Sequence, residues 1–204
     1  MSKSKTTRSL IIGSSLLLAL ALTAGTALAQ QIEIHPYAGG FFPGKWADTA
    51  NFKKEGIYGI RGGVYLIDFV ELDANFGYIN HFKFRDTPDF GTRAFLWDFN
   101  GSYSLNGYKV KKAEPFVTIG LGGLTAGLHG TPGPNIASTF LSTPLKDNDS
   151  FLQFTYGGGI KGVRLWGPLG IRADVRGRTV PNFYGSSLSW FEATGGINVI
   201  WGER

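Results

Sequence analysis

The chain has 204 residues, of which 30 are glycine, 14% are aromatic and 17% are charged. This length fits one domain, and the charged fraction lies below the roughly 25% of ordinary soluble domains. Because the chain has no cysteine, disulfides and thiolate metal sites are excluded.

Residues 1–29 have the pattern of a secretory signal peptide. They contain three cations, Lys3, Lys5 and Arg8, then a largely apolar run, and end in the small-x-small sequence Ala27-Leu28-Ala29. A transmembrane helix would need about 20 apolar residues, and this run is shorter. We therefore expect export, with cleavage after Ala29 and a mature domain of residues 30–204. Losing the three cations lowers the formal net charge from +5 to +2, so no nucleic-acid partner is expected.

From residue 30 onward, apolar and polar residues alternate with a period of two, which is typical of β-strands. The alternation is clear in residues 70–78, 95–105, 169–177 and 191–201, and weaker in 32–41, 57–66, 115–129 and 151–165. Several segments reach the 9–11 residues of a tilted membrane strand. The pattern predicts an all-β protein with eight antiparallel strands in an up-and-down transmembrane barrel, although six or ten strands remain possible.

The predicted connections alternate between long and short. Long connections are expected at residues 42–55, 83–92, 130–150 and 179–187, and shorter ones at 67–69, 106–113 and 166–168. Transmembrane barrels have short periplasmic turns and long external loops. This alternation favours a membrane barrel over a soluble sandwich.

The two faces of the strands differ in chemistry. The polar face carries charges of both signs, which would meet across a narrow lumen: Arg61, Glu71, Asp73, Asp98, Lys161, Arg172, Asp174, Arg176 and Glu192. Buried charges need partners, and both signs are available, so we expect an interior ionic network. The apolar face is rich in aromatic residues, and four tryptophans near strand ends are expected to form a girdle at the lipid headgroups: Trp97, Trp166, Trp190 and Trp201.

A soluble lipocalin-like carrier is an alternative, because it would also have eight alternating strands. Gly44-Lys45-Trp46 matches the Gly-x-Trp of that family. In lipocalins this sequence opens the first strand, whereas here it falls in the first long loop. The match is therefore treated as coincidental.

The segment 154–162, which contains Gly157-Gly158-Gly159-Ile160-Lys161, leads through a turn into Arg172-Ala173-Asp174-Val175-Arg176. This pair of strands resembles the outer-membrane β-barrel domain related to the eight-stranded transmembrane part of outer-membrane protein A. Residues 58–63 and 70–78 resemble its second and third strands. The resemblance implies residence in the outer membrane and contact with its lipid.

The last predicted strand resembles the signal that the barrel-assembly machinery reads. The matching residues are Thr194, Gly196, Val199 and Trp201. Three residues follow the aromatic position, whereas many members of the family stop there. The resemblance implies that the assembly machinery is a partner during biogenesis.

No arrangement of residues predicts catalysis, a cofactor or a metal site. The three histidines, His35, His81 and His129, are expected near strand ends, and none forms the His-x-Ser pair of a lipid A deacylase. We therefore expect a non-enzymatic barrel with a structural or surface-interaction role, plugged by its ionic network, with recognition on the external loops. An outer-membrane lipid-modifying enzyme is the alternative.

Overall fold

The structure is a computed structural model that describes residues 31–46, 50–83, 91–105, 113–127 and 149–202. The predicted signal peptide and most of the segments 83–92 and 130–150 lie outside the described residues. Within the described ranges, no helix is long and apolar enough to span a membrane. The strands are β1 (Gln31–Pro43), β2 (Lys45–Trp46), β3 (Ala50–Asn51), β4 (Glu55–Ile67), β5 (Val70–Lys83), β6 (Gly91–Ser104), β7 (Ala113–Ala126), β8 (Asp149–Trp166), β9 (Leu169–Phe183) and β10 (Ser186–Gly202).

Eight strands close into an antiparallel barrel in the order β1-β10-β9-β8-β7-β6-β5-β4. The first and last strands join directly, from Gln31 opposite Gly202 to Pro43 opposite Trp190. The remaining two strands, β2 and β3, form a small separate hairpin. The predicted eight-stranded up-and-down barrel is confirmed.

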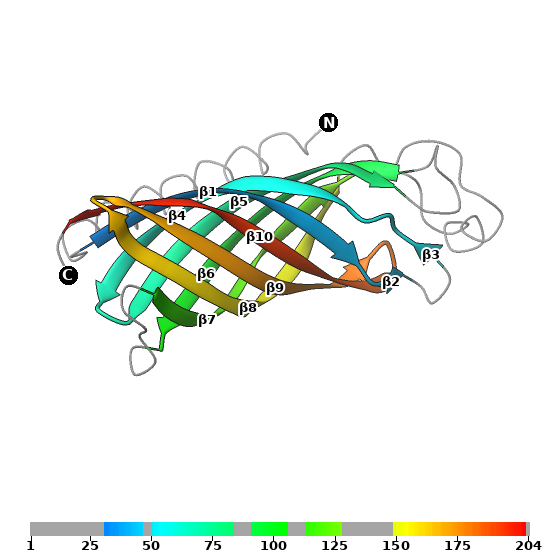
Figure 1. Cartoon of the computed structure of the whole chain (residues 1–204). Helices are drawn as coiled ribbons and strands as arrows, with labels where there is room; N and C mark the ends of the chain where they lie inside the picture. Colours follow the sequence, from blue (N-terminus) through cyan, green and yellow to red (C-terminus); the bar gives the residue numbers. More distant parts are fainter. Residues whose placement is uncertain (1–30, 47–49, 84–90, 106–112, 128–148, 203–204) are drawn as a thin grey trace, which may run out of the picture.

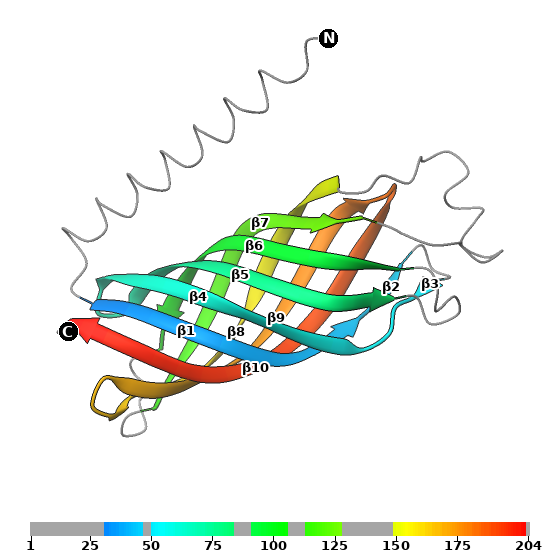
Figure 2. The same ribbon diagram turned by 90° about the horizontal axis from the view of Figure 1, so that it is seen from above.

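The two ends of the barrel differ (Figures 1 and 2). The terminal end contains the start of β1, the end of β10 and two tight turns, at residues 68–69 and 167–168. The opposite end, here called the hairpin end, contains the β2–β3 hairpin and the connections from β5 to β6, β7 to β8 and β9 to β10.

The connection between β9 and β10 is a tight turn, so the predicted long loop 179–187 is wrong. β9 continues to Phe183 and β10 begins at Ser186. Tyr184 and Gly185 have φ angles of 46° and 88°, the pair of positive values found in type I′ hairpin turns. The Gly185 N–H donates a hydrogen bond to the Asn182 side chain at 3.0 Å. The long-short alternation therefore fails at this last connection.

Side chains alternate between the lumen and the outer surface along every barrel strand. In β10, Glu192 is 1% exposed, whereas the neighbouring Phe191 is 58% exposed. Large apolar side chains are similarly exposed on other strands, among them Ile119 at 71% and Val175 at 59%. The barrel is therefore apolar outside and largely polar inside, the reverse of a soluble protein.

Candidate functional site: the filled lumen

All nine side chains predicted for the interior network are buried inside the barrel: Arg61, Glu71, Asp73, Asp98, Lys161, Arg172, Asp174, Arg176 and Glu192. The alternation of the strands places them there, since each lies on the inward face. The structure adds polar residues that the sequence analysis did not assign, notably Glu33, His35 and Arg178. Glu33 and His35 lie on β1, where alternation in the sequence is weak.

Nearest the terminal end, two cations and two carboxylates form a compact cluster. The Arg172 guanidinium lies 3.0 Å from Glu33 Oε1 and 3.4 Å from Glu71 Oε1. The Lys161 ammonium contacts the Glu71 carboxylate and lies 3.5 Å from Glu33 Oε2. The Tyr65 hydroxyl accepts from Lys161 at 3.0 Å and donates to Glu33 at 3.1 Å. The charges of this cluster balance.

In the middle of the lumen, Asp174 is shared among three guanidinium groups. Its carboxylate lies 2.7 Å from Arg61, 3.2 Å from Arg176 and 3.3 Å from Arg172. Arg61 also donates to Thr194 Oγ1 at 3.2 Å. The Arg172 side chain contacts both Asp174 and the cluster near the terminal end, so it connects the two groups of charges.

Asp98 connects Arg176 to a further pair of charges, Arg178 and Glu192. It lies 2.5 Å from Arg178 and 3.9 Å from Arg176, and Arg178 Nε lies 2.9 Å from Glu192. Asp73 is held differently, since it accepts hydrogen bonds from Asn100 at 2.8 Å and from Ser102 at 3.2 Å. The nine predicted residues thus lie in one lumen, but Asp73 is bound by an amide and a hydroxyl rather than by a cation.

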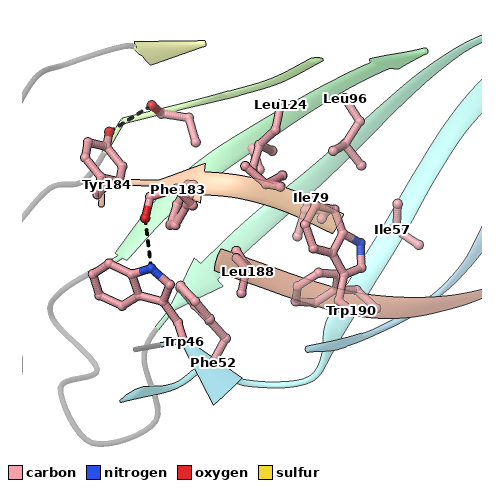
Figure 3. Close-up of a cluster of buried hydrophobic side chains, with 14 of the residues drawn as sticks. Trp46, Phe52, Ile57, Ile79, Leu96, Leu124, Phe183, Tyr184, Leu188 and Trp190 are labelled. Carbon is pink, nitrogen blue, oxygen red and sulfur yellow. Dashed lines mark hydrogen bonds between the residues drawn. The ribbon is translucent and has the colours of Figure 1, made fainter. Parts of the chain in front are cut away.

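A second, apolar layer fills the lumen at the hairpin end (Figure 3). We call it the apolar layer; its buried members are Tyr37, Phe41, Trp46, Phe52, Ile57, Ile79, Ala94, Leu96, Leu124, Ala126, Val180, Phe183, Tyr184, Leu188 and Trp190. Trp46 and Phe52 come from the segment that contains the β2–β3 hairpin, and the Trp46 indole N–H donates to Phe183 O at 2.9 Å. The sequence pattern predicts only an ionic plug, so this layer is an addition to the prediction.

The predicted tryptophan girdle requires correction. Trp190 is 1% exposed and points into the lumen, where its indole N–H donates to Glu192 Oε1 at 2.9 Å. Trp97 is on the outer surface at 38% exposure but lies near the middle of β6. Trp166 and Trp201 are 67% and 50% exposed, and both lie at the terminal end of the barrel. Only these two combine exposure with a position at a barrel end, as the predicted girdle requires.

The histidines offer no catalytic arrangement within the described residues. His35 was expected near a strand end, but its ring is buried inside the barrel, with Nε2 3.8 Å from Asp174 and Nδ1 3.3 Å from the Ile197 carbonyl. His129 and the side chain of His81 lie outside the described parts of the structure. In the part of the chain that is described, no group of three potential ligands is placed to hold a metal ion.

No protein-family model and no curated protein matches this chain in sequence. Among solved structures, the N-terminal barrel domain of Pseudomonas aeruginosa OprF is 14% identical, with a TM-score of 0.56 over 85% of this chain and 98% of that one. Neisserial surface protein A is 10% identical, with a TM-score of 0.58 over 84% and 97% of the two chains. The chain has the fold of an eight-stranded outer-membrane β-barrel.

A third barrel of this fold, the outer-membrane protein OprG from Pseudomonas aeruginosa, is 9% identical, with a TM-score of 0.57 over 86% of this chain and 97% of that one. The resemblance predicted from the sequence is thus confirmed at the level of fold.

The residues that resemble an assembly signal lie on both faces of β10 in this barrel. Thr194 is buried and faces the lumen, whereas Trp201 is half exposed on the outer surface. Gly196 lies opposite Arg172 on β9 and Val199 opposite Leu169. The motif therefore combines an inward polar position with an outward aromatic one.

Proposed function

We propose that this protein is an integral outer-membrane barrel with a closed lumen and a structural or surface-interaction role. The observation that carries the proposal is the reversed distribution of side chains, with charges buried inside and large apolar residues exposed outside. Exposed apolar side chains are stable in the hydrocarbon of a bilayer. The closed barrel is also stable there, because it leaves no unpaired strand edge in lipid.

The dimensions of the outer surface support the membrane placement. On β6, the outward positions from Phe95 to Tyr103 carry no charge, and Arg93 precedes them. Ten positions separate Arg93 from Tyr103, which corresponds to about 25 Å along the barrel axis for a strand tilted by about 40°. This is the height of the apolar band of outer-membrane barrels, about 25 Å.

Two different fillings support a closed lumen. The ionic network occupies the middle and the terminal end, and the apolar layer occupies the hairpin end. An eight-stranded barrel has an interior just wide enough for its side chains. Ions would have to displace paired charges at one level and packed aromatic rings at the other, and both displacements are costly.

The hairpin end is proposed to face the cell exterior and to carry any recognition. Three of its four connections are long, as external loops of outer-membrane barrels are. Residues 179–187 are no longer candidates, because β9 and β10 meet there in a tight turn. Biogenesis would use the barrel-assembly machinery, which would recognise the signal in β10.

Three measurements test the proposal. Cell fractionation should place the protein in the outer membrane, and its migration on a gel should change on heating, as it does for detergent-resistant barrels. In planar bilayers the folded protein should give little conductance. A soluble periplasmic product would contradict the membrane placement, and large, steady channels would contradict the closed lumen.

A further inference from the structure

Four cations gather at the hairpin end of strands β4, β5 and β6. We call them the cationic rim: Lys53, Lys54, Lys83 and Arg93. The Lys53 N–H donates to Lys83 O at 2.8 Å, and Lys83 pairs with Gly91, two positions from Arg93. These contacts place the four backbone positions within about 12 Å of one another, since neighbouring strands lie about 5 Å apart and residues in a strand about 3.3 Å apart.

Two of the four cations, Lys54 and Arg93, border the outer surface, whereas Lys53 and Lys83 are half-buried. Lys54 and Arg93 are exposed and continue the outward series of their strands, above Tyr58 on β4 and Phe95 on β6. The Lys54 ammonium lies 5.7 Å from the centre of the exposed Phe42 ring. Among the described residues at this end of the three strands, Glu55 contributes the one carboxylate beside the four cations.

An aromatic surface lies directly below the rim, on the same three strands. Tyr58 and Tyr78 pair across β4 and β5, with ring centres 5.4 Å apart, and Phe76 and Phe95 pair across β5 and β6 at 6.4 Å. Tyr58, Phe76 and Phe95 are each at least 40% exposed. The surface therefore changes from cationic to aromatic within two to five residues along each strand.

We propose that the cationic rim and the aromatic surface form a binding site for an anionic membrane lipid with a terminal phosphate in its headgroup. Lysine and arginine of the rim would bind the phosphate oxygens, and the acyl chains would lie along the rings. Lysine and arginine near a membrane surface attract anionic lipids, and arginine binds phosphate through paired N–H donors. Because the rim lies where the apolar band ends, its charges reach the headgroup layer without entering hydrocarbon. This inference rests on the proposed membrane placement.

The test measures lipid retention by the full-length barrel in phosphatidylcholine vesicles with and without phosphatidic acid. After detergent extraction, native mass spectrometry should find phosphatidic acid bound in preference to phosphatidylcholine. The variant Lys54→Gln/Lys83→Gln/Arg93→Gln should lose about 100-fold in this preference, at about fivefold per cation. The matched variant Lys54→Arg/Lys83→Arg/Arg93→Lys keeps every charge and should retain it.

The possible outcomes separate this inference from the proposed function. Equal retention of both lipids by the wild-type protein would overturn the lipid site, and so would a neutralised variant with unchanged preference. Full competition by inorganic phosphate would indicate an ion site and would also overturn it. If the neutralised variant does not fold, the preference of the wild-type protein must still weaken as salt is raised. Failure of the wild-type protein to insert into phosphatidylcholine alone would instead contradict the membrane placement.

Discussion

At the scale of single residues, Lys161 holds two buried carboxylates together. Replacing it with methionine leaves Glu33 and Glu71 with one cation, Arg172, between them. Because removing one partner leaves a buried charge uncompensated, Lys161→Met should destabilise the barrel by about 3–5 kcal/mol. Urea unfolding in lipid vesicles measures this change.

The control for this variant removes a carboxylate as well. In Lys161→Met/Glu71→Met, one carboxylate and one guanidinium remain, Glu33 and Arg172, 3.0 Å apart. We expect the double variant to be more stable than Lys161→Met alone. A double variant that is less stable than the single variant would show that charge balance does not control the stability of this cluster.

Alanine substitutions at two neighbouring glycines, Gly62 and Gly63, are expected to change the stability of the barrel differently. A Cβ on Gly63 would clash with Oε1 of Glu71, whose other carboxylate oxygen contacts Lys161, whereas a Cβ on Gly62 would meet nothing within 4 Å. Gly63→Ala should therefore cost about 1–3 kcal/mol through overpacking. Gly62→Ala should be neutral or slightly stabilising. Equal unfolding midpoints of the two variants would show that the lumen accommodates the extra methyl group.

The alternation of side chains along a strand alone places most of the interior charges correctly. The prediction for Trp190 is wrong because it does not follow this alternation. Trp190 and Glu192 are two residues apart in one strand, so they share a face, and both are buried. The preference of tryptophan for membrane interfaces predicts an outward position for Trp190, but the period of two along the strand determines its face. In contrast, the pairing of Asp174 with three guanidiniums from two strands depends on register across the barrel, which a single sequence does not contain.

At the scale of elements, the β2–β3 hairpin covers the lumen. The Trp46 ring packs against Phe183 and Phe52, with ring centres 5.9 Å and 6.5 Å away. Trp46→Ala removes these contacts and the indole hydrogen bond, so the hairpin should detach from the apolar layer. Trypsin cleavage after Lys45, Lys53 or Lys54 should then become faster.

The barrel itself should survive this change, since β1 and β4 pair along 11 positions without the hairpin. Heat-modifiable migration on a gel should therefore be unchanged in Trp46→Ala. Trp201→Ala is the matched control, because it removes the same side chain at the terminal end. If both variants are cleaved like the wild-type protein, the hairpin is not held by Trp46.

The apolar layer was missed because apolar residues at the hairpin end occupy both faces of a strand. Phe95, Leu96 and Trp97 are consecutive, but Leu96 is fully buried whereas its two neighbours are about 40% exposed. In such runs the period of two disappears from the sequence. The turn at Tyr184 was missed for a related reason: its ring enters the apolar layer, which accounts for a tyrosine at a position that usually carries asparagine, aspartate or glycine.

At the scale of the whole molecule, the ionic network and the apolar layer lie one after the other along the lumen, so an ion would have to pass both. Trp46→Ala/Trp190→Ala should thin the apolar layer and leave the ion pairs of the network in place, although it removes the indole hydrogen bond to Glu192. Arg61→Ala/Asp174→Ala removes one cation and one carboxylate, and with them the three ion pairs of Asp174, and leaves the net charge of the network unchanged. We expect each double variant to stay closed in planar bilayers and the fourfold variant to conduct. Conduction by either double variant would show that the filling changed in that variant is by itself what blocks the passage of ions.

The closure of the barrel between the first and the last strand also affects the order of events during folding. Each barrel strand pairs with the next one along the chain, apart from β1 and β10, which meet across 171 positions from Gln31 to Gly202. Local hairpins form early, whereas a distant pairing must first overcome the entropy of closing a long loop. Until it does, β1 and β10 both present open backbone, the kind of edge that pairs with other chains. The interval before closure is therefore the period in which the nascent protein is most exposed to aggregation.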